Sequence, residues 1–205
     1  MKNSSEDSPL EIDNILNINQ SSKVYKQTIP VNVYHFYLVN EIESPSNYIE
    51  LLNTLKFAEP HDTILIYINC SGGDLYTTIQ IIGAINKCRG TVITSLDGAA
   101  FSAASMIFLS GHAHLVTPHS SLMIHNYSGF LNGKGHEMSS QIKFTEKFFE
   151  SFIKEIYGKF LNEAEIKDVL DGKDIWLNSE EVSRRLKNKL VKEKNNSKLK
   201  KQSKN

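Results

Sequence analysis

The chain has 205 residues, of which 40% are hydrophobic and 22% are charged. This length suits one domain with its own core, and the composition disfavours a fully disordered chain, a collagen or a disulfide scaffold. The 23 Lys and Arg residues equal the 23 Asp and Glu residues in number, but residues 184–205 carry ten basic groups and one acidic group, a charge of +9, so residues 1–183 carry −9. An acidic body with a basic tail is typical of a contact with nucleic acid or with a partner.

The composition divides the chain into three parts. Residues 1–25 are polar and lack the apolar segment of a secretory signal, which predicts a flexible leader. Residues 26–186 form the predicted domain, and the Lys-, Asn- and Ser-rich residues 187–205 form a basic tail whose composition favours disorder. No apolar run reaches the roughly 18 residues of a membrane span. Cys70 and Cys88 are too few for a disulfide framework, so we expect free thiols in a reducing compartment. Because neither a secretory signal nor a membrane span is predicted, we also expect a cytoplasmic protein without membrane contact.

In the first half of the chain, strand-like and helix-like segments alternate. Val31–Val39 is rich in β-branched and aromatic residues and predicts a strand, and Pro45–Phe57 predicts a helix. Thr63–Ile68 is almost continuously apolar, which is typical of a strand buried on both faces of a parallel sheet. Asn69–Asp74 predicts a tight turn, and Leu75–Ile85 has apolar residues at helical spacing.

The second half continues this alternation. Thr91–Leu96 predicts a further strand, and the small residues of Ala99–Leu109 predict a helix that follows it directly. His114–Val116 and Leu122–Ile124 predict short strands, and Met138–Phe160 predicts a long amphipathic helix. Strands that alternate with helices indicate an α/β fold with a parallel sheet.

Several polar residues and glycines lie where strands end. Ser102 falls in the first turn of a predicted helix, where free N–H groups and the helix dipole suit an alkoxide or an oxyanion. His125 follows a strand and lies at the sheet's rim, and Asp174 lies in a turn. Each alone is more commonly structural: a packing serine, a rim histidine, a turn cap. Gly72 and Gly73 either make a turn or aim a backbone N–H at a developing negative charge.

Four segments, in order, together resemble a known family. They are Tyr67–Gly73 beside the motif Y-I-N-S-P-G-G, Gly98–Ser102 beside G-x-A-A-S, Met123–His125 beside M-I-H, and Asp174–Glu181 beside D-x-F-(L/M)-S-x-x-E-A. These motifs are those of the proteolytic subunit of the ATP-dependent Clp protease, and the order Ser, His, Asp is also that family's. The glycine-rich residues 129–135 before a long helix resemble its handle. The resemblance covers about residues 30–186 and implies a crotonase-like α/β fold of repeated β-β-α units with a protruding handle helix.

The resemblance also implies a mechanism. Ser102 would be the nucleophile, His125 the general base and Asp174 the residue that orients the imidazole. The N–H groups of Gly72 and Ala103 would form the oxyanion hole. The backbone that pairs with an extended peptide substrate would comprise Gly73, Asp74, Leu75 and Gly129. The family's chemistry needs no cofactor and no metal ion.

Assembly and partners follow from the same resemblance. Family members form two stacked seven-membered rings around a closed chamber, and the handle helices join the rings. Phe148, Phe149, Phe152 and Ile153 crowd one helix, more than a single face buries easily in a monomer. An AAA+ unfoldase would supply unfolded polypeptides as substrates. Nucleic acid is expected, if at all, only at the basic tail.

The sequence departs from the family's motifs at several positions. Ser71 replaces a Pro, Phe101 replaces the Ala before the nucleophile, and Ala103 replaces the Met after it. Residues 126–127 replace Gln-Pro, and Trp176 replaces a Phe. None of these changes removes a reacting group. They indicate a divergent member, such as a phage-encoded or organellar copy.

Other functions stay open at this point. An inactive scaffold subunit of a Clp-type ring and a prohead-type maturation protease share the resemblance, and a crotonase-type acyl-CoA enzyme shares the fold. A scaffold typically lacks triad residues, and an acyl-CoA enzyme would not need Ser102 and His125 in these motifs. Metal binding through His112, His114 and His119 is disfavoured, since no carboxylate or thiol stands nearby in the sequence.

Overall fold

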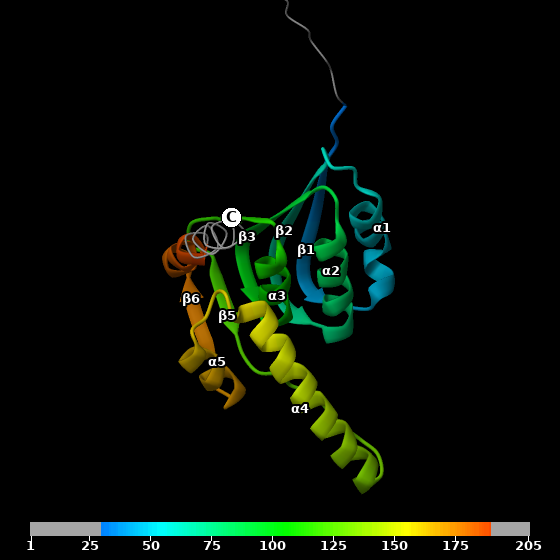
Figure 1. The fold of residues 1–205 in the computed structure, drawn as a ribbon, viewed down its shortest axis with the longest axis vertical. Helices are drawn as coiled ribbons and strands as arrows, with labels where there is room; N and C mark the ends of the chain where they lie inside the picture. The colour runs from blue at the N-terminus through cyan, green and yellow to red at the C-terminus, as the bar shows by residue number, and fades with distance from the viewer. Residues whose placement is uncertain (1–29, 190–205) are drawn as a thin grey trace, which may run out of the picture. The chain divides into compact units, whose positions relative to one another are not determined.

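The computed structural model describes residues 30–189 (Figure 1). Its elements are β1 (Val33–Ile42), η2 (Pro45–Tyr48), α1 (Ile49–Phe57), β2 (Thr63–Gly73), α2 (Leu75–Lys87), β3 (Thr91–Phe101), α3 (Ala103–Ser110), β4 (Ala113–Val116), β5 (Ser121–Ile124), α4 (Gly135–Tyr157), α5 (Glu163–Leu170) and β6 (Ile175–Asn178). Residues 179–189 are also helical. The predicted leader and tail residues 190–205 lie outside the described residues, and the predicted boundary at residue 186 falls within this last helix.

A single sheet organises the fold. Its strands lie in the order β1, β2, β3, β5, β6, and β4 also pairs with β3. Every pairing is parallel except that of β5 with β6. Helices α1 and α2 lie between the first parallel strands along the chain, as crossover connections require. The predicted α/β class is therefore confirmed, and Figure 1 shows α4 extending away from the sheet as predicted for the handle.

The core lies between the sheet and its helices. In β2, Ile64, Ile66 and Ile68 are fully buried, whereas the residues between them are half-buried. Helix α3 packs on β2 and β3 and beside α2. The predicted burial on both faces of this strand is complete on one face only, because its side chains alternate between faces and those on the second face are half-buried. Within residues 30–189, no helix combines the length and the apolar character needed to cross a bilayer.

Two strands extend further than their sequences predict. β2 continues to Gly73, through the predicted turn, and β3 continues to Phe101. Residues 99–101 pair with β5, so the helix predicted from Ala99 begins only at Ala103. This pairing outweighs the helix propensity of the alanines. The sequence patterns missed α5 and β6, which are short, and β6 forms through its pairing with β5.

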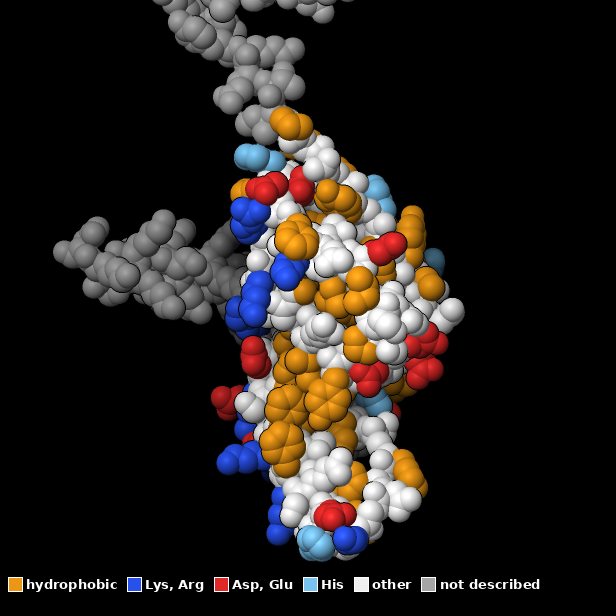
Figure 2. Space-filling view, turned by 90° about the vertical axis from the view of Figure 1, so that its right-hand side faces the viewer, with side chains coloured by type: hydrophobic (Ala, Val, Ile, Leu, Met, Phe, Trp, Pro, Cys, Tyr) orange, Lys and Arg blue, Asp and Glu red, His pale blue; other side chains and the backbone are white. Residues whose placement is uncertain are grey.

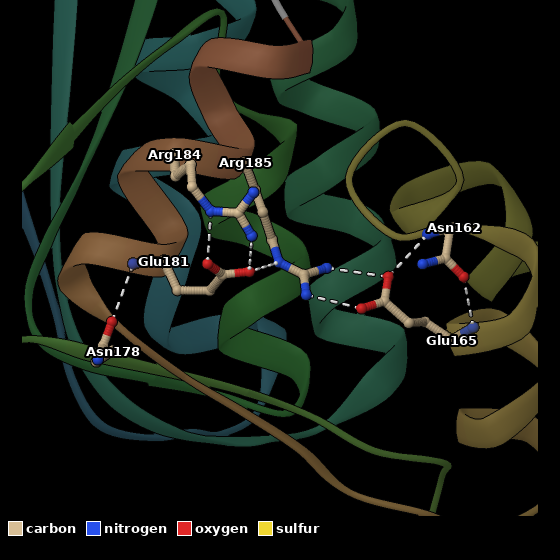
Figure 3. A network of polar contacts seen from close by, with 6 residues as sticks. All are labelled: Asn162, Glu165, Asn178, Glu181, Arg184 and Arg185. Carbon is tan, nitrogen blue, oxygen red and sulfur yellow. Dashed lines mark hydrogen bonds and ion pairs between the residues drawn. The ribbon is translucent and has the colours of Figure 1, made fainter.

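Arg185 fastens the last helix to α5 (Figure 3). Its guanidinium donates to both carboxylate oxygens of Glu165, at 2.7 and 3.0 Å, and to Glu181 at 2.7 Å. Arg184 donates twice to the same Glu181, and the side chain of Asn178 accepts the Glu181 N–H at 2.9 Å. The network thus fixes the helix that directly follows β6.

Candidate active site

The chain turns sharply between β3 and α3, and Ser102 occupies this turn. Its φ of 54° is a positive value that non-glycine residues rarely adopt, at a cost of about 1–3 kcal/mol. Its N–H donates to the carbonyl oxygen of Met123 at 2.9 Å, which ties the turn to β5. Ser102 is the N-cap residue of α3, which begins at Ala103. The prediction that it lies in the first turn of the helix was therefore wrong by one residue.

His125, which directly follows β5, reaches the Ser102 hydroxyl. The distance from His125 Nε2 to Ser102 Oγ is 2.6 Å, and both residues are half-buried. When Nε2 is unprotonated, the hydroxyl donates to it, which is how a general base activates a serine. The parallel pairing of β3 with β5 brings together these two residues, which lie far apart in the sequence.

Asp174 lies close in register to His125 but does not bond to it. In the antiparallel pair of β5 and β6, Ile124 is opposite Ile175. The same register, continued by one residue, places Asp174 opposite His125. Asp174 is exposed, and neither a hydrogen bond nor an ion pair joins it to His125 within the described chain. The structure thus places the third predicted residue beside the pair without completing a triad.

Gly72 packs directly against Ser102. Its φ is +104°, and a Cβ built on it would lie 2.8 Å from Ser102 Cβ, 2.8 Å from the Phe101 carbonyl oxygen and 3.3 Å from Ala103 N. Only glycine fits such a close approach at this φ. The Gly72 N–H, however, points to the Sγ atom of Cys70 at 3.5 Å. It is therefore not free for an oxyanion in this structure, in contrast to the predicted role.

Ala103 and Cys70 complete the surroundings of the turn. As the first residue of α3, Ala103 has no carbonyl one turn earlier in the helix to accept its N–H. Cys70 is 1% exposed, and its thiol donates in turn to the Gly72 carbonyl oxygen at 3.7 Å. Burial raises the pKa of the Cys70 thiol, so the protonated form persists at neutral pH. Of the two predicted oxyanion donors, the Ala103 N–H thus has no acceptor within its helix, and the Gly72 N–H is bonded to Cys70 Sγ.

Three residues predicted to bind substrate lie against β1 or within α2. Gly73 pairs with Ile42, and a Cβ on Gly73 would lie 2.2 Å from the Ile42 carbonyl oxygen. That same oxygen accepts the Asp74 N–H at 2.8 Å, and Asp74 caps α2 by accepting the Thr77 N–H at 2.7 Å. Leu75 is the first residue of α2 and is half-buried. This segment is thus occupied by structural contacts with β1 and α2.

Gly129 lies in a different environment. It is exposed, in a segment without regular structure between β5 and α4, and no atom lies within 4 Å of the position its Cβ would occupy. It lines a hollow of about 600 Å³ together with Tyr127, Glu150 and Leu170. Gly73 and Asp74 are exposed as well, but of the four predicted substrate-binding residues Gly129 is the one that lines this hollow.

The structure adds two pairs that the sequence patterns did not reveal. Phe101 meets Trp176 edge to face, with ring centroids 5.1 Å apart. Both residues depart from the family's motifs, and that is the only sequence feature that could have indicated this pair. Ser105 and Tyr157 meet in the core at 2.7 Å between their hydroxyl oxygens. No sequence signal pointed to that pair, because the two residues belong to different helices far apart in the chain.

Two of the three histidines considered for metal binding, His112 and His114, have structural partners. His112 Nδ1 accepts the Val92 N–H at 3.1 Å, and His114 Nδ1 lies 3.0 Å from Thr94 Oγ1. Among residues 30–189, no group of three or more His, Cys, Asp or Glu side chains is placed to hold a metal ion.

Comparison with known proteins points to one family. A family model described as Clp protease matches residues 19–185. The chain is also similar to a protein of Deinococcus radiodurans named ATP-dependent Clp protease proteolytic subunit, with 26% identity over 145 residues, 69% of this chain and 71% of that protein.

Two other proteins with the same printed name match a shorter part of the chain. The protein of Chlorella vulgaris is 31% identical over 101 residues, 48% of this chain and 50% of that protein. The protein of Bacteroides fragilis is 31% identical over 105 residues, 50% of this chain and 49% of that protein. In both cases the match spans about half the length of the relative.

Proposed function

The chain belongs to the Clp protease family of serine peptidases, and from that premise we propose that it hydrolyses peptide bonds with Ser102 as the nucleophile and His125 as the general base. The observation that carries this proposal is the 2.6 Å distance between Ser102 Oγ and His125 Nε2. The strained backbone of Ser102 supports it, because such strain concentrates at functional sites.

The proposed reaction has two steps. Ser102 Oγ attacks the scissile carbonyl carbon while His125 Nε2 takes the hydroxyl proton, and the tetrahedral intermediate collapses as Nε2 protonates the leaving amine. Water then attacks the acyl-enzyme, giving up a proton to Nε2, and Ser102 regains its hydroxyl as the acid product leaves. The Ala103 N–H is the proposed oxyanion donor, and loss of one such donor typically costs about 3–4 kcal/mol of transition-state stabilisation.

Asp174 and Gly72 have proposed roles that require local movement. Asp174 would orient the imidazole by accepting its Nδ1 proton, once its exposed side chain turns toward His125. Gly72 would become a second oxyanion donor if its N–H exchanged the Cys70 sulfur for the substrate oxygen. The present positions of these two groups favour the second candidate, an inactive scaffold subunit of a Clp-type ring.

We also propose an assembled form. The printed name of the relatives, a proteolytic subunit of an ATP-dependent protease, supports a homo-oligomer that receives unfolded polypeptides from an AAA+ unfoldase. An aromatic ladder on α4 suits contact with further copies: Phe144 stacks on Phe148, and Phe148 stacks on Phe152. Phe144 is exposed, and the other two rings are half-buried. Figure 2 shows hydrophobic side chains gathered along this part of the molecule. Stacked seven-membered rings joined through α4 are the proposed arrangement.

A fluorophosphonate probe, which reacts covalently with activated serines, tests the proposed nucleophile. We expect intact-mass analysis to show one label on the wild-type protein and no label on Ser102→Ala. Ser110→Ala is the matched control, because Ser110 lies on the same helix and bonds only to the Met106 carbonyl within the described chain. A wild-type protein that stays unlabelled in its assembled form would establish the scaffold instead.

A further inference from the structure

The backbone carbonyl of Ser102 is held by a residue that the proposed mechanism does not use. Ser105, one turn further along α3, donates its N–H to the Ser102 carbonyl oxygen at 2.9 Å and its hydroxyl to the same oxygen at 2.6 Å. Ser105 is fully buried. The N–H bond spans three residues, as in the tightened first turn of a helix, whereas the hydroxyl bond is a second, side-chain contact to the same carbonyl.

Tyr157 extends this contact to α4. It lies at the end of that helix, is fully buried, and places its hydroxyl 2.7 Å from Ser105 Oγ. Because the only hydrogen on Ser105 Oγ goes to the Ser102 carbonyl, Tyr157 must be the donor between the two hydroxyls. Burial raises the pKa of Tyr157, so this donor keeps its proton. The hydrogen bonds therefore all run in one direction, from Tyr157 through Ser105 to Ser102.

This series of hydrogen bonds links helix α4 to the strained turn at Ser102. The inner part of α4 is anchored in the core by Phe149, Ile153 and Tyr157, while its outer part is largely exposed. At the other end of this series of hydrogen bonds, Ser102 has a positive φ that the surrounding contacts must maintain. A displacement of α4 that breaks the contact with Ser105 would therefore loosen the carbonyl of the nucleophile itself.

Resting on the proposed function, we propose that Tyr157 is a positioning residue, which acts through Ser105 to hold the Ser102 backbone in its reactive conformation. Neither hydroxyl touches the substrate. Their contribution is to geometry, and small misplacements of a reacting group have large effects on rate.

The test is a double-mutant cycle on the rate of Ser102 labelling by the fluorophosphonate probe. We expect Tyr157→Phe and Ser105→Ala each to lower the second-order rate constant about tenfold, an effect within the range that mispositioning produces. The double variant should react no more slowly than Ser105→Ala, because Tyr157 then has nothing to act through. With a short peptide substrate, kcat should fall and KM should stay unchanged.

Tyr48→Phe is the matched control. Tyr48 is also buried and its hydroxyl also bonds to backbone, the Glu43 N–H and the Glu41 carbonyl, but none of these groups contacts the nucleophile turn. We expect Tyr48→Phe to lower the melting temperature and to leave the labelling rate of the folded molecules unchanged, and a merely structural role of Tyr157 would give the same two results for Tyr157→Phe. That result, or fully additive effects in the cycle, would overturn the inference and leave the proposed function intact. An unlabelled wild-type protein would overturn both.

Discussion

Ser102 and Gly72 form one packed unit, in which each residue depends on the shape of the other. The positive φ of Ser102 directs the chain from β3 into α3, and the missing side chain of Gly72 leaves room for that turn. The N–H of Gly72 is held by Cys70, and the carbonyl of Ser102 is held by Ser105. The geometry of Ser102 is thus maintained by Gly72 and Ser105, and that of Gly72 by Cys70.

Gly72→Ala is expected to abolish or strongly reduce labelling of Ser102. The new Cβ would lie 2.8 Å from both Ser102 Cβ and the Phe101 carbonyl oxygen, at a φ of +104°, so the nucleophile turn must shift. We expect a loss in stability of about 1–3 kcal/mol and a labelling rate lower by about 100-fold. Urea unfolding and the labelling rate measure the two effects.

Gly83→Ala is the control for this substitution. No atom lies within 4 Å of the position that its Cβ would occupy, and Gly83 lies within α2. We expect this variant to gain about 0.5–1 kcal/mol from helix propensity and to be labelled at the wild-type rate. Normal labelling of Gly72→Ala would contradict the close packing of Gly72 against Ser102.

At the level of the elements, Arg185 holds two helices together. It joins the last helix to α5, and the last helix directly follows β6, which pairs with β5 beside the site. Only 17% of the Arg185 side chain is exposed, whereas in the pair Arg89–Glu59 the arginine is 58% exposed. Exposed pairs contribute little to stability, and loss of one partner from a largely buried pair leaves an uncompensated charge.

We expect Arg185→Met to lower the free energy of unfolding by about 1–2 kcal/mol at pH 7. Glu165 and Glu181 would then face each other without the cation between them. Arg89→Met should change stability by less than about 0.5 kcal/mol. Urea unfolding of both variants measures the difference, and equal effects would show that burial does not distinguish the two pairs.

The same network predicts a pH dependence. The hydrogen bonds from Arg185 hold the pKa of the Glu165 carboxyl below its usual value of 4.5. A lowered pKa in the folded state means that the unfolded chain binds more protons, so this contribution is complete above about pH 4.5 and is lost as the pH falls toward the folded pKa. Glu165→Gln should therefore flatten the decline in melting temperature below pH 4.5, and an unchanged decline would contradict this role.

At the scale of the whole molecule, α4 has two different halves. Its inner end is buried and carries Tyr157, and the aromatic ladder of Phe144, Phe148 and Phe152 extends along the helix toward its exposed end. Phe144 is 63% exposed. An aromatic ladder of this kind marks a surface for association. Contact between copies at the outer half and positioning of Ser102 at the inner end would connect assembly with activity.

Phe144→Asp is expected to disrupt assembly without unfolding the domain. The charged side chain would have to be desolvated in any interface through the ladder, while in the separate subunit it stays in water. We expect native mass spectrometry to show the wild-type protein as an oligomer and Phe144→Asp at half that mass or less. Ser139→Asp adds the same charge at an exposed position of α4 outside the ladder and should assemble normally. A wild-type monomer would contradict the proposed rings.

Much of the fold was predictable because its signals are local. The β-branched runs predicted strands at the positions of β1, β2 and β3, and the amphipathic spacing predicted α4. The errors lie where a distant partner decides the local conformation. Residues 99–101 carry helix-favouring alanines but pair with β5, and β6 is a strand only because β5 lies beside it.

The family resemblance and the candidates Ser102 and His125 could be read from the sequence, because short motifs keep the chemical groups in a recognisable order. How those groups meet depends on the three-dimensional fold: Ser102 Oγ lies 2.6 Å from His125 Nε2, Asp174 lies beside His125 with no hydrogen bond to it within the described residues, and the Gly72 N–H is bonded to Cys70 Sγ. The fold also brings the hydroxyl of Tyr157 on α4 to the hydroxyl of Ser105, which in turn donates to the Ser102 carbonyl oxygen. Contacts of this kind depend on strand register and helix packing across tens of residues, which a local pattern does not encode.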